Sequence, residues 1–237
     1  MERKTRNILI TLAALLAVAF LHSCMEEETE YAQLTIGTIR VIEGPEYYFE
    51  IDNGSTMYPG DTTNIHNYTP EEGQRAFVHF DLLDEKVPGY DYNAIVYRIE
   101  NILTKDIYFM PPEKNDSIGD DPVNITDVWF TGDYINIQYQ LYFDKSSDVK
   151  HTLSLVVNEE TTASGSDTST DYLPLEFRHN AHHEPQTDHG AGLVSFKIDN
   201  ILPLMQGKKE CASASEHSTT ACNTKKPSSD SPEYKRP

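Results

Sequence analysis

Cysteine, tryptophan and basic residues are all scarce in this chain of 237 residues. It contains three cysteines and one tryptophan. No Cys-x-x-Cys pair and no His-Glu-x-x-His motif occurs, so the common zinc and dithiol signatures are missing. Ser166 and Ser195 both follow glycine-containing stretches, but neither lies in the strand–turn–helix context of a nucleophile elbow. We therefore expect a protein that is not an enzyme and needs no cofactor.

The scarcity of basic residues leaves the chain strongly acidic. Lys and Arg number 19 against 38 Asp and Glu, which gives a formal net charge of −19 at pH 7. This excess of negative charge repels phosphate backbones and anionic lipid headgroups. Binding to nucleic acid is therefore disfavoured, and so is electrostatic docking on a membrane. Any attachment to a membrane is expected to be covalent.

Long apolar runs are also missing, except for one near the N-terminus. Residues 8–21 are almost all apolar, but the run is shorter than the about 20 residues that a membrane-spanning helix needs. Three basic residues precede it: Arg3, Lys4 and Arg6. Ser23-Cys24 ends it, as in a lipoprotein signal peptide, although His22 stands where a small or branched residue is commoner. We expect residues 1–23 to be removed and Cys24 to be lipidated; ordinary cleavage nearby is the alternative.

The residues around the three cysteines suggest different fates for them. Acyl chains on Cys24 would anchor the protein stably. Residues 24–31 are acidic and lack apolar periodicity, so they read as a solvated tether. Cys211 and Cys222 remain as one disulfide pair that an oxidising compartment would permit, and whether they pair stays open.

Short strand patterns fill residues 32–108, and no long helical pattern interrupts them. Tyr47, Phe49 and Ile51 alternate with polar or tyrosine positions, and Asn53-Gly54 then provides a turn. The chain holds 14 tyrosines, which favour strands. Several short strands within this length predict a small barrel or a curled sheet.

A second β-domain is predicted at residues 125–205, after a proline-rich, acidic linker at residues 109–124. Its strongest strand pattern alternates Ile135 and Ile137 with Asn136 and continues with period two. Such strands close a core as two antiparallel sheets packed face to face. Residues 206–237 contain no large aliphatic side chain, and we expect this tail to be disordered.

Four phrases of the second domain, together with the leader and the β-rich region before them, resemble the NigD-like family of Bacteroidetes lipoproteins. The phrases are Gly132–Ile137, His151–Leu155, Leu175–Asn180 and Gly192–Phe196. The resemblance covers roughly residues 32–201 and implies an OB-like N-terminal barrel, a C-terminal β-sandwich and no established catalytic residues. It also implies an association with a bacteriocin operon. In such bacteria, acidic residues after the lipidated cysteine resemble a signal for surface export, which is an alternative to a plain spacer.

One cluster of side chains is a candidate metal site. It contains four histidines and a carboxylate: His179, His182, His183, His189 and Asp188. Dense histidine and carboxylate groups bind zinc, copper or nickel. The competing interpretation is a solvated hairpin loop between two strands, with His179 satisfied near the end of the sheet. The sequence favours the loop, and we assign no metal site.

Aromatic residues offer a second kind of surface. Tyr47, Tyr48, Tyr90 and Tyr92 could contact a glycan or a peptide, although strand alternation explains most of them without a ligand. We expect Trp129 to anchor the core of the sandwich rather than to stack on a sugar.

These observations together predict an all-β lipoprotein of the cell envelope, with a small OB-like barrel, an antiparallel β-sandwich and a disordered tail. Its expected role is to bind or scaffold a protein or glycan partner without catalysis. The alternative is a metal-binding envelope protein that uses residues 179–189. We expect the outer membrane of a Gram-negative bacterium, held through lipid on Cys24; the periplasmic and the cell-surface face are both open.

Overall fold

The computed structural model describes residues 33–159, 172–205, 210–215 and 218–223. The signal peptide, Cys24 and the acidic tether lie outside these residues. The described residues are almost entirely β-structure, with one 3-10 turn (Pro112–Lys114) and a four-residue helix, α3 (Leu202–Met205). No helix among them is long and apolar enough to cross a membrane.

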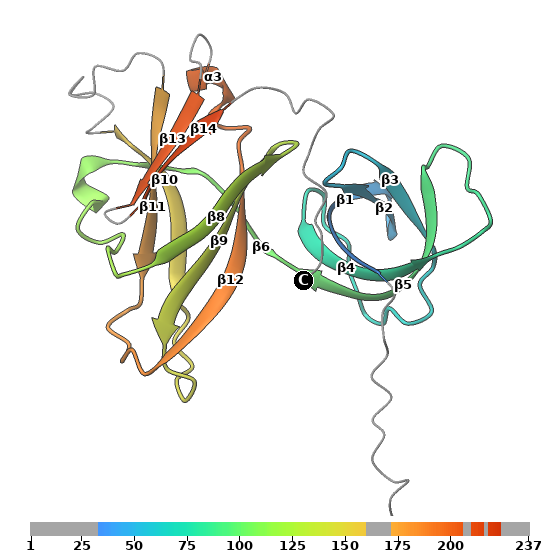
Figure 1. Ribbon diagram of the computed structural model, residues 1–237, viewed down its shortest axis with the longest axis horizontal. Helices are drawn as coiled ribbons and strands as arrows, with labels where there is room; N and C mark the ends of the chain where they lie inside the picture. The colour runs from blue at the N-terminus through green and yellow to red at the C-terminus, as the bar shows by residue number, and fades with distance from the viewer. Residues whose placement is uncertain (1–32, 160–171, 206–209, 216–217, 224–237) are drawn as a thin grey trace, which may run out of the picture. The chain divides into compact units, whose positions relative to one another are not determined.

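The first five strands close into a barrel (Figure 1). They are β1 (Gln33–Glu43), β2 (Glu46–Ile51), β3 (Thr56–Asp61), β4 (Arg75–Leu82) and β5 (Tyr92–Asn101). The hydrogen-bonded order is β1-β2-β3-β5-β4, and β1 closes the ring because its first half pairs with β4 and its second half with β2. This is the connectivity of an OB fold, as predicted.

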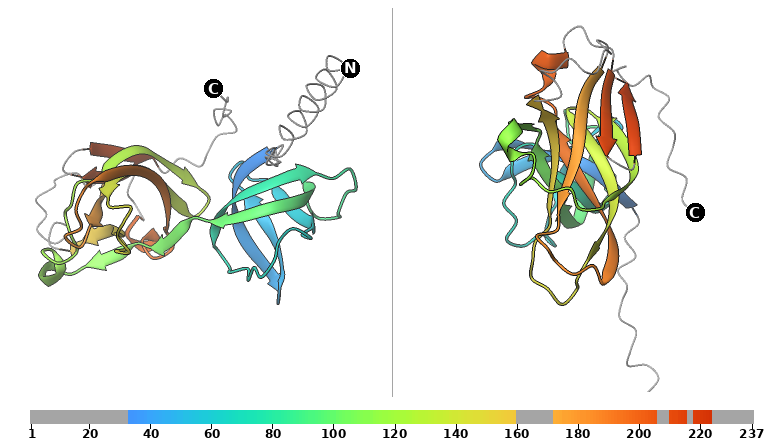
Figure 2. Two further views of the ribbon diagram at one scale, coloured as in Figure 1. Left: turned by 90° about the horizontal axis from the view of Figure 1, so that it is seen from below. Right: turned by 90° about the vertical axis from the view of Figure 1, so that its left-hand side faces the viewer.

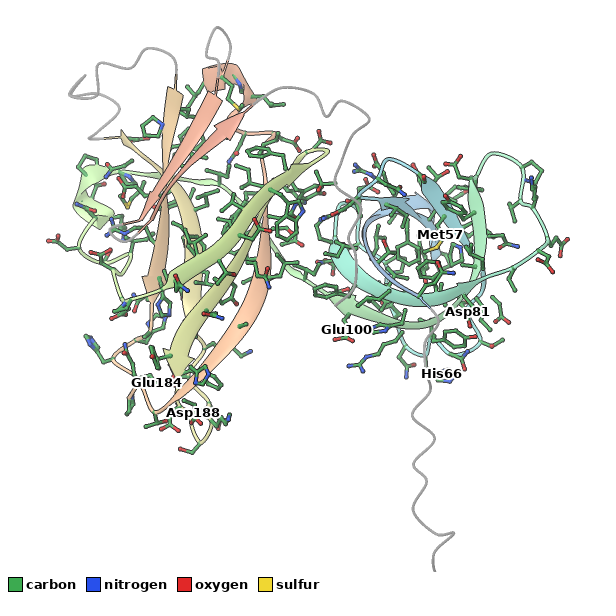
Figure 3. The ribbon with its side chains drawn as sticks, in the orientation of Figure 1. Met57, His66, Asp81, Glu100, Glu184 and Asp188 are labelled. Atoms are coloured by element: carbon green, nitrogen blue, oxygen red, sulfur yellow. The ribbon has the colours of Figure 1, made fainter. Side chains whose placement is uncertain are left out.

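Strand alternation fills the barrel interior. Tyr47, Phe49 and Ile51 of β2 are all buried, and Met57 of β3 lies with them inside the ring of strands (Figure 3). Tyr48 and Glu50 are half-exposed on the outer face of β2. Tyr47 therefore belongs to the core, and the expectation that it helps to form an exposed ligand surface is wrong. Strand alternation places its side chain on the same inward face as Phe49 and Ile51.

The remaining strands form a two-sheet sandwich (Figures 1 and 2). One sheet has the order β6-β12-β9-β8, with β6 (Leu103–Asp106), β12 (Asp188–Lys197), β9 (Tyr134–Phe143) and β8 (Asn124–Thr131). The other has the order β14-β13-β11-β10-β7, with β14 (Ser218–Asn223), β13 (Glu210–Ser215), β11 (Tyr172–Asn180), β10 (Thr152–Asn158) and β7 (Tyr108–Met110).

The sandwich core contains the inward residues of both sheets. Ile135, Ile137, Leu155 and Phe196 are at most 2% exposed. The prediction that Trp129 anchors the sandwich core is wrong. Its neighbours Val128 and Phe130 pack on the core, so strand alternation places the half-buried Trp129 on the opposite face of β8. The long central pairings are antiparallel as predicted, whereas the β6–β12, β7–β10 and β11–β13 pairs are parallel.

The sandwich uses more of the chain than the sequence pattern indicates. β6 and β7 lie in its sheets, whereas the sequence pattern predicts that the barrel extends to residue 108. The expected linker is tied to β11, because Asp121 N donates to His179 O (2.9 Å) and Arg178 Nε donates to Gly119 O (2.9 Å). Within the tail that was expected to be disordered, the structure describes β13 and β14. The backbone of β13 pairs with β11 and that of β14 pairs with β13, so this hairpin extends the sheet by backbone hydrogen bonds, which require no apolar pattern.

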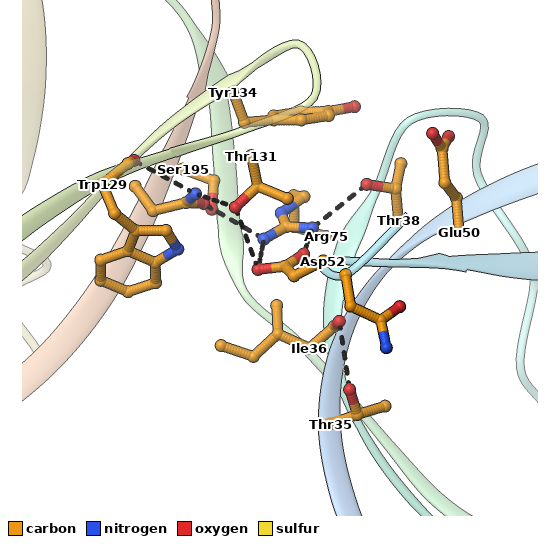
Figure 4. Close-up of polar contacts among 12 residues, drawn as sticks. Thr35, Ile36, Thr38, Glu50, Asp52, Arg75, Trp129, Thr131, Tyr134 and Ser195 are labelled. Atoms are coloured by element: carbon orange, nitrogen blue, oxygen red, sulfur yellow. Dashed lines mark hydrogen bonds and ion pairs between the residues drawn. The ribbon is translucent and has the colours of Figure 1, made fainter. Parts of the chain in front are cut away.

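A buried arginine connects the barrel to the sandwich (Figure 4). The side chain of Arg75, at the start of β4, is completely buried and forms a two-pronged ion pair with Asp52. Its Nη2 also donates to Asn136 Oδ1 on β9 (3.3 Å), and that oxygen accepts a second hydrogen bond from Ser195 (2.7 Å). The Tyr134 ring lies 5.2 Å from the guanidinium carbon. Polar groups at the start of β9 are therefore buried on the face that points away from the sandwich core.

Candidate functional site

One end of the sandwich carries a chain of buried acid and base groups. His179 is 1% exposed at the end of β11, and its Nε2 lies 2.9 Å from His151 Nδ1. His151 Nε2 lies 2.6 Å from Glu184 Oε2, which also accepts a hydrogen bond from Asp144 N (3.0 Å). Figure 3 shows Glu184 and Asp188 at this end. The loops before β10 and before β12 are thereby joined.

The hydrogen-bond partners fix where the protons lie in this chain. His179 Nδ1 is 3.1 Å from the carbonyl oxygen of Pro122, which can only accept, so this nitrogen carries a hydrogen. In neutral His179 the Nε2 atom then accepts from His151 Nδ1–H. With Glu184 ionised, its Oε2 accepts a hydrogen bond from His151 Nε2. The three side chains thus form one continuous hydrogen-bonded chain from Glu184 to the Pro122 carbonyl.

Burial and hydrogen bonding lower the pKa values of His179 and Glu184, the two ends of this chain of side chains. Burial lowers the pKa of His179 below its ordinary value of 6.5, which keeps that ring neutral. The Ser147 hydroxyl, followed by the Asp144 amide and His151, lowers the pKa of Glu184 below its ordinary 4.5. Both shifts favour the protonation pattern that the geometry requires.

The structure separates the candidate metal ligands. His179 faces His151, whereas His182 Nε2 lies 2.9 Å from Thr152 Oγ1. Asp188 pairs with Lys145 (3.3 Å), and the His189 ring lies 6.4 Å from that of Tyr142. Among the described residues, no group of three His, Cys, Asp or Glu side chains is arranged to hold a metal ion. The arrangement does not bring the five sequence candidates together into one site.

A second candidate site is the open end of the barrel, here called the barrel mouth. It is a cavity of about 250 Å³ lined by residues from all five barrel strands and the β2–β3 turn: Gln33, Leu34, Thr35, Ile51, Asn53, Met57, Phe80, Leu82 and Tyr92. Leu34, Leu82 and Tyr92 are 56%, 46% and 40% exposed. Apolar side chains gathered around an opening are typical of a surface that a partner covers.

Comparison with protein families assigns both domains. A family model described as NigD-like N-terminal OB domain matches residues 36–102, and one described as NigD-like C-terminal beta sandwich domain matches residues 106–215. The chain belongs to the NigD-like family. The resemblance predicted from the sequence is thus confirmed, and so is the order of barrel and sandwich.

Several solved structures share this fold. A protein of unknown function from Bacteroides vulgatus is 26% identical, with a TM-score of 0.66 over 82% of this chain and 90% of that chain. A NigD-like immunity protein from Bacteroides caccae is 13% identical (TM-score 0.57; 81% and 92% covered). A Bacteroides fragilis protein named "putative lipoprotein" is also 13% identical (TM-score 0.57; 82% and 99% covered). The comparison with curated proteins gives no match.

The sequence did not predict the contact between His151 and Glu184, and it did not predict the barrel mouth. His151 and Glu184 lie 33 positions apart, so no local spacing links them, and only the pairing of β10 with β11 brings them together. The barrel mouth also has no sequence signal, because its lining comes from separate strand ends. Strand alternation places Leu82 on the same face of β4 as the buried Val78 and Phe80, and its exposure follows from its position at the end of the strand.

Proposed function

We propose that this NigD-like protein is a non-catalytic lipoprotein of the outer membrane that binds a protein partner at the barrel mouth. The observation that carries the proposal is the exposure of the apolar side chains of Leu34, Leu82 and Tyr92 around a cavity whose lining combines apolar and polar groups. A single apolar side chain of a partner fits a space of about 250 Å³. Asp84 and Glu85 follow Leu82 closely in the sequence, and Asp91 directly precedes Tyr92. Because these carboxylates are negatively charged, the preferred partner presents basic residues around its apolar anchor.

The leader sequence and two neighbours support the location and the partner class. Ser23-Cys24 ends a leader of the lipoprotein type. The Bacteroides fragilis neighbour is named "putative lipoprotein", and the Bacteroides caccae neighbour is named an immunity protein, a name that suggests a protein partner. Protease treatment of intact cells distinguishes the surface face, where the protein is digested, from the periplasmic face, where it is protected.

The absence of a complete catalytic arrangement in the described ranges supports a binding role. Thr152 lies beside His182, but no carboxylate in those ranges is hydrogen-bonded to the His182 ring to orient it. The Glu184–His151–His179 chain ends on the Pro122 carbonyl rather than on a nucleophile. Acid–base groups without a nucleophile or a substrate cavity beside them do not make a hydrolase.

Site-specific photocrosslinking in intact cells tests the binding role. A photoreactive phenylalanine analogue replaces Leu82, and the control carries it in place of Tyr142, which is 53% exposed on β9. We expect one discrete protein adduct from position 82 that disappears when Leu34→Asp is added, because both side chains line the barrel mouth. The control should give no such adduct. Absence of an adduct at position 82, or an adduct that survives Leu34→Asp, would contradict the proposal.

A further inference from the structure

Three tyrosines from different elements form a continuous row on the outer face of the barrel. Tyr48 lies on β2, Tyr58 on β3 and Tyr90 in the loop between β4 and β5. The Tyr90 ring centroid is 5.4 Å from that of Tyr48 and 5.1 Å from that of Tyr58, with interplanar angles of 54° and 34°. All three residues are half-buried. We call Tyr48, Tyr90 and Tyr58 the tyrosine row.

The loop that carries Tyr90 is fixed to the sheet. Asp91 Oδ2 accepts hydrogen bonds from both the backbone N (2.8 Å) and the hydroxyl (2.9 Å) of Thr56, and Asp91 N donates to Thr56 O (3.1 Å). Gly89 has a φ of +93°, a conformation that glycine adopts readily and that turns the chain into this contact. The row is therefore held in place without a ligand, which lowers the entropic cost of binding one.

The hydroxyl groups distinguish this row from tyrosines with a structural hydrogen bond. Tyr68 donates to Asn101 (2.7 Å), and Tyr134 donates to the Gly73 carbonyl (2.8 Å). Within the part of the chain that the structure describes, the hydroxyls of the tyrosine row have no hydrogen-bond partner. They remain available to a ligand that has hydroxyl groups of its own.

The position of the row on the OB barrel and its charge select the ligand class. In OB folds, the face of strands 2 and 3, with the loop between strands 4 and 5, binds oligosaccharides or oligonucleotides. Carboxylates of Glu46, Glu50 and Asp91 share the strand and loop that supply Tyr48 and Tyr90. Arg40 lies opposite Tyr48 on β1, but it pairs with both Glu50 (2.7 Å) and Glu72 (3.1 Å), so negative charge stays in excess and repels a phosphate backbone. The same carboxylates accept hydrogen bonds from sugar hydroxyl or ammonium groups.

We propose that the tyrosine row is a binding site for an oligosaccharide made of neutral or amino sugars. The aromatic faces stack on the apolar side of the sugar rings, while tyrosine hydroxyls and carboxylates bind the sugar hydroxyls. The site lies on the outer face of β2 and β3, whereas the barrel mouth is lined by strand ends. The inference does not depend on the protein partner proposed above.

Calorimetric titration of the full mature protein in detergent tests this site. The probes are a tetrasaccharide of N-acetylglucosamine and its de-acetylated, cationic form. We expect saturable binding that Tyr90→Leu weakens about tenfold or more, because leucine keeps apolar contact with Tyr48 and Tyr58 but offers no aromatic face. Tyr90→Phe keeps the ring and should retain most of the affinity.

Tyr142→Ala is the control, because it removes an exposed aromatic ring (53% exposed) from the sandwich, and it should leave binding unchanged. Thermal melting of each variant verifies that it is folded; if Tyr90→Leu does not fold, Tyr48→Ala takes its place. Failure of the wild-type protein to bind either sugar would overturn the inference. So would equal affinities of Tyr90→Leu and wild type, or displacement of the sugar by a thymidine oligonucleotide.

Discussion

At the level of single residues, Arg75 combines complete burial with a charge. Its guanidinium has Asp52 on one side and Asn136 on the other, and its Nε has no partner within the described residues. Removing one member of such a pair destabilises the folded protein strongly, because the remaining buried charge then has no partner. Asp52 keeps 24% of its side chain exposed, so water offsets part of that loss.

Arg75→Met is expected to lower the free energy of unfolding by about 3 kcal/mol, the lower end for breaking a buried ion pair. Urea denaturation followed by circular dichroism measures it. Arg98→Met is the control, because Arg98 is 58% exposed and its pair with Glu100 should contribute less than about 1 kcal/mol. The double variant Arg75→Met with Asp52→Asn should lose less than the sum of its single changes. Equal losses for Arg75→Met and Arg98→Met would contradict this account.

The histidine–glutamate chain predicts a loss of stability on acidification. His179 and Glu184 both have lowered pKa values in the folded protein, so the unfolded chain binds more protons than the folded one at acid pH. Their contribution is complete above pH 6.5, and the His179 part is lost as the pH falls from there towards its folded pKa. The Glu184 part is lost as the pH falls below 4.5 towards its own folded pKa.

Melting temperatures between pH 8 and pH 4 measure this dependence. His179→Gln should flatten the curve just below pH 6.5, because glutamine cannot take up the proton. His66→Asn, at an exposed position, should leave the shape of the curve unchanged. A wild-type protein as stable at pH 5 as at pH 7.5 would disprove the assignment.

At the level of elements, the segment before β8 shows how backbone contacts can replace an apolar pattern. Gly119 has a φ of +96°, and a Cβ added there would lie 2.6 Å from the His179 carbonyl oxygen and 2.4 Å from Asn180 Cβ. The segment can approach β11 only because this residue has no side chain. Proline content and charge made residues 109–124 look like a linker, and neither property reports such an approach.

Gly119→Ala should therefore destabilise the sandwich by roughly 1–3 kcal/mol, through backbone strain and the displacement of β11. Gly44→Ala is a matched control, because Gly44 also has a positive φ (+56°) but a Cβ there would meet nothing within 4 Å. Chemical denaturation of both variants measures the difference. If Gly44→Ala costs as much as Gly119→Ala, then the close approach to β11 has no energetic weight.

β9 explains why the strands were predictable and the site was not. Its second half alternates exposed Gln138 and Gln140 with partly buried residues, and that period-two pattern is visible in the sequence. Its first half is buried on both faces, and nothing in the pattern reveals that Asn136 meets Arg75 from β4. Local periodicity records one covered face, whereas long-range contacts depend on the topology that brings strands together.

At the level of the whole molecule, charge and lipidation together determine where the protein can be. A net charge of −19 disfavours adsorption to anionic lipid, so the proposed membrane attachment depends on Cys24 alone. OB barrel and sandwich could be predicted because strand patterns and family phrases span both. The leader lies outside the described residues, and its fate remains a prediction from sequence.

Cys24→Ser should move the protein from the membrane fraction to the soluble periplasmic fraction, because serine cannot receive the thioether-linked lipid. Mass spectrometry of the wild-type protein should show an acylated N-terminus at Cys24. Ser23→Ala keeps a small residue before the cysteine and should leave the protein in the membrane. Membrane retention of Cys24→Ser, or a mature N-terminus at another residue, would refute the anchor.

The first residues of β1 line the barrel mouth, and this gives the anchor a geometric consequence. Nine peptide units separate Cys24 from Gln33, and a fully extended chain of that length reaches about 30 Å. With Cys24 held in lipid, the mouth can sample only a thin layer of fluid above the bilayer. A ligand that diffuses along the membrane surface would therefore encounter the barrel mouth far more often than a ligand that diffuses in bulk solution.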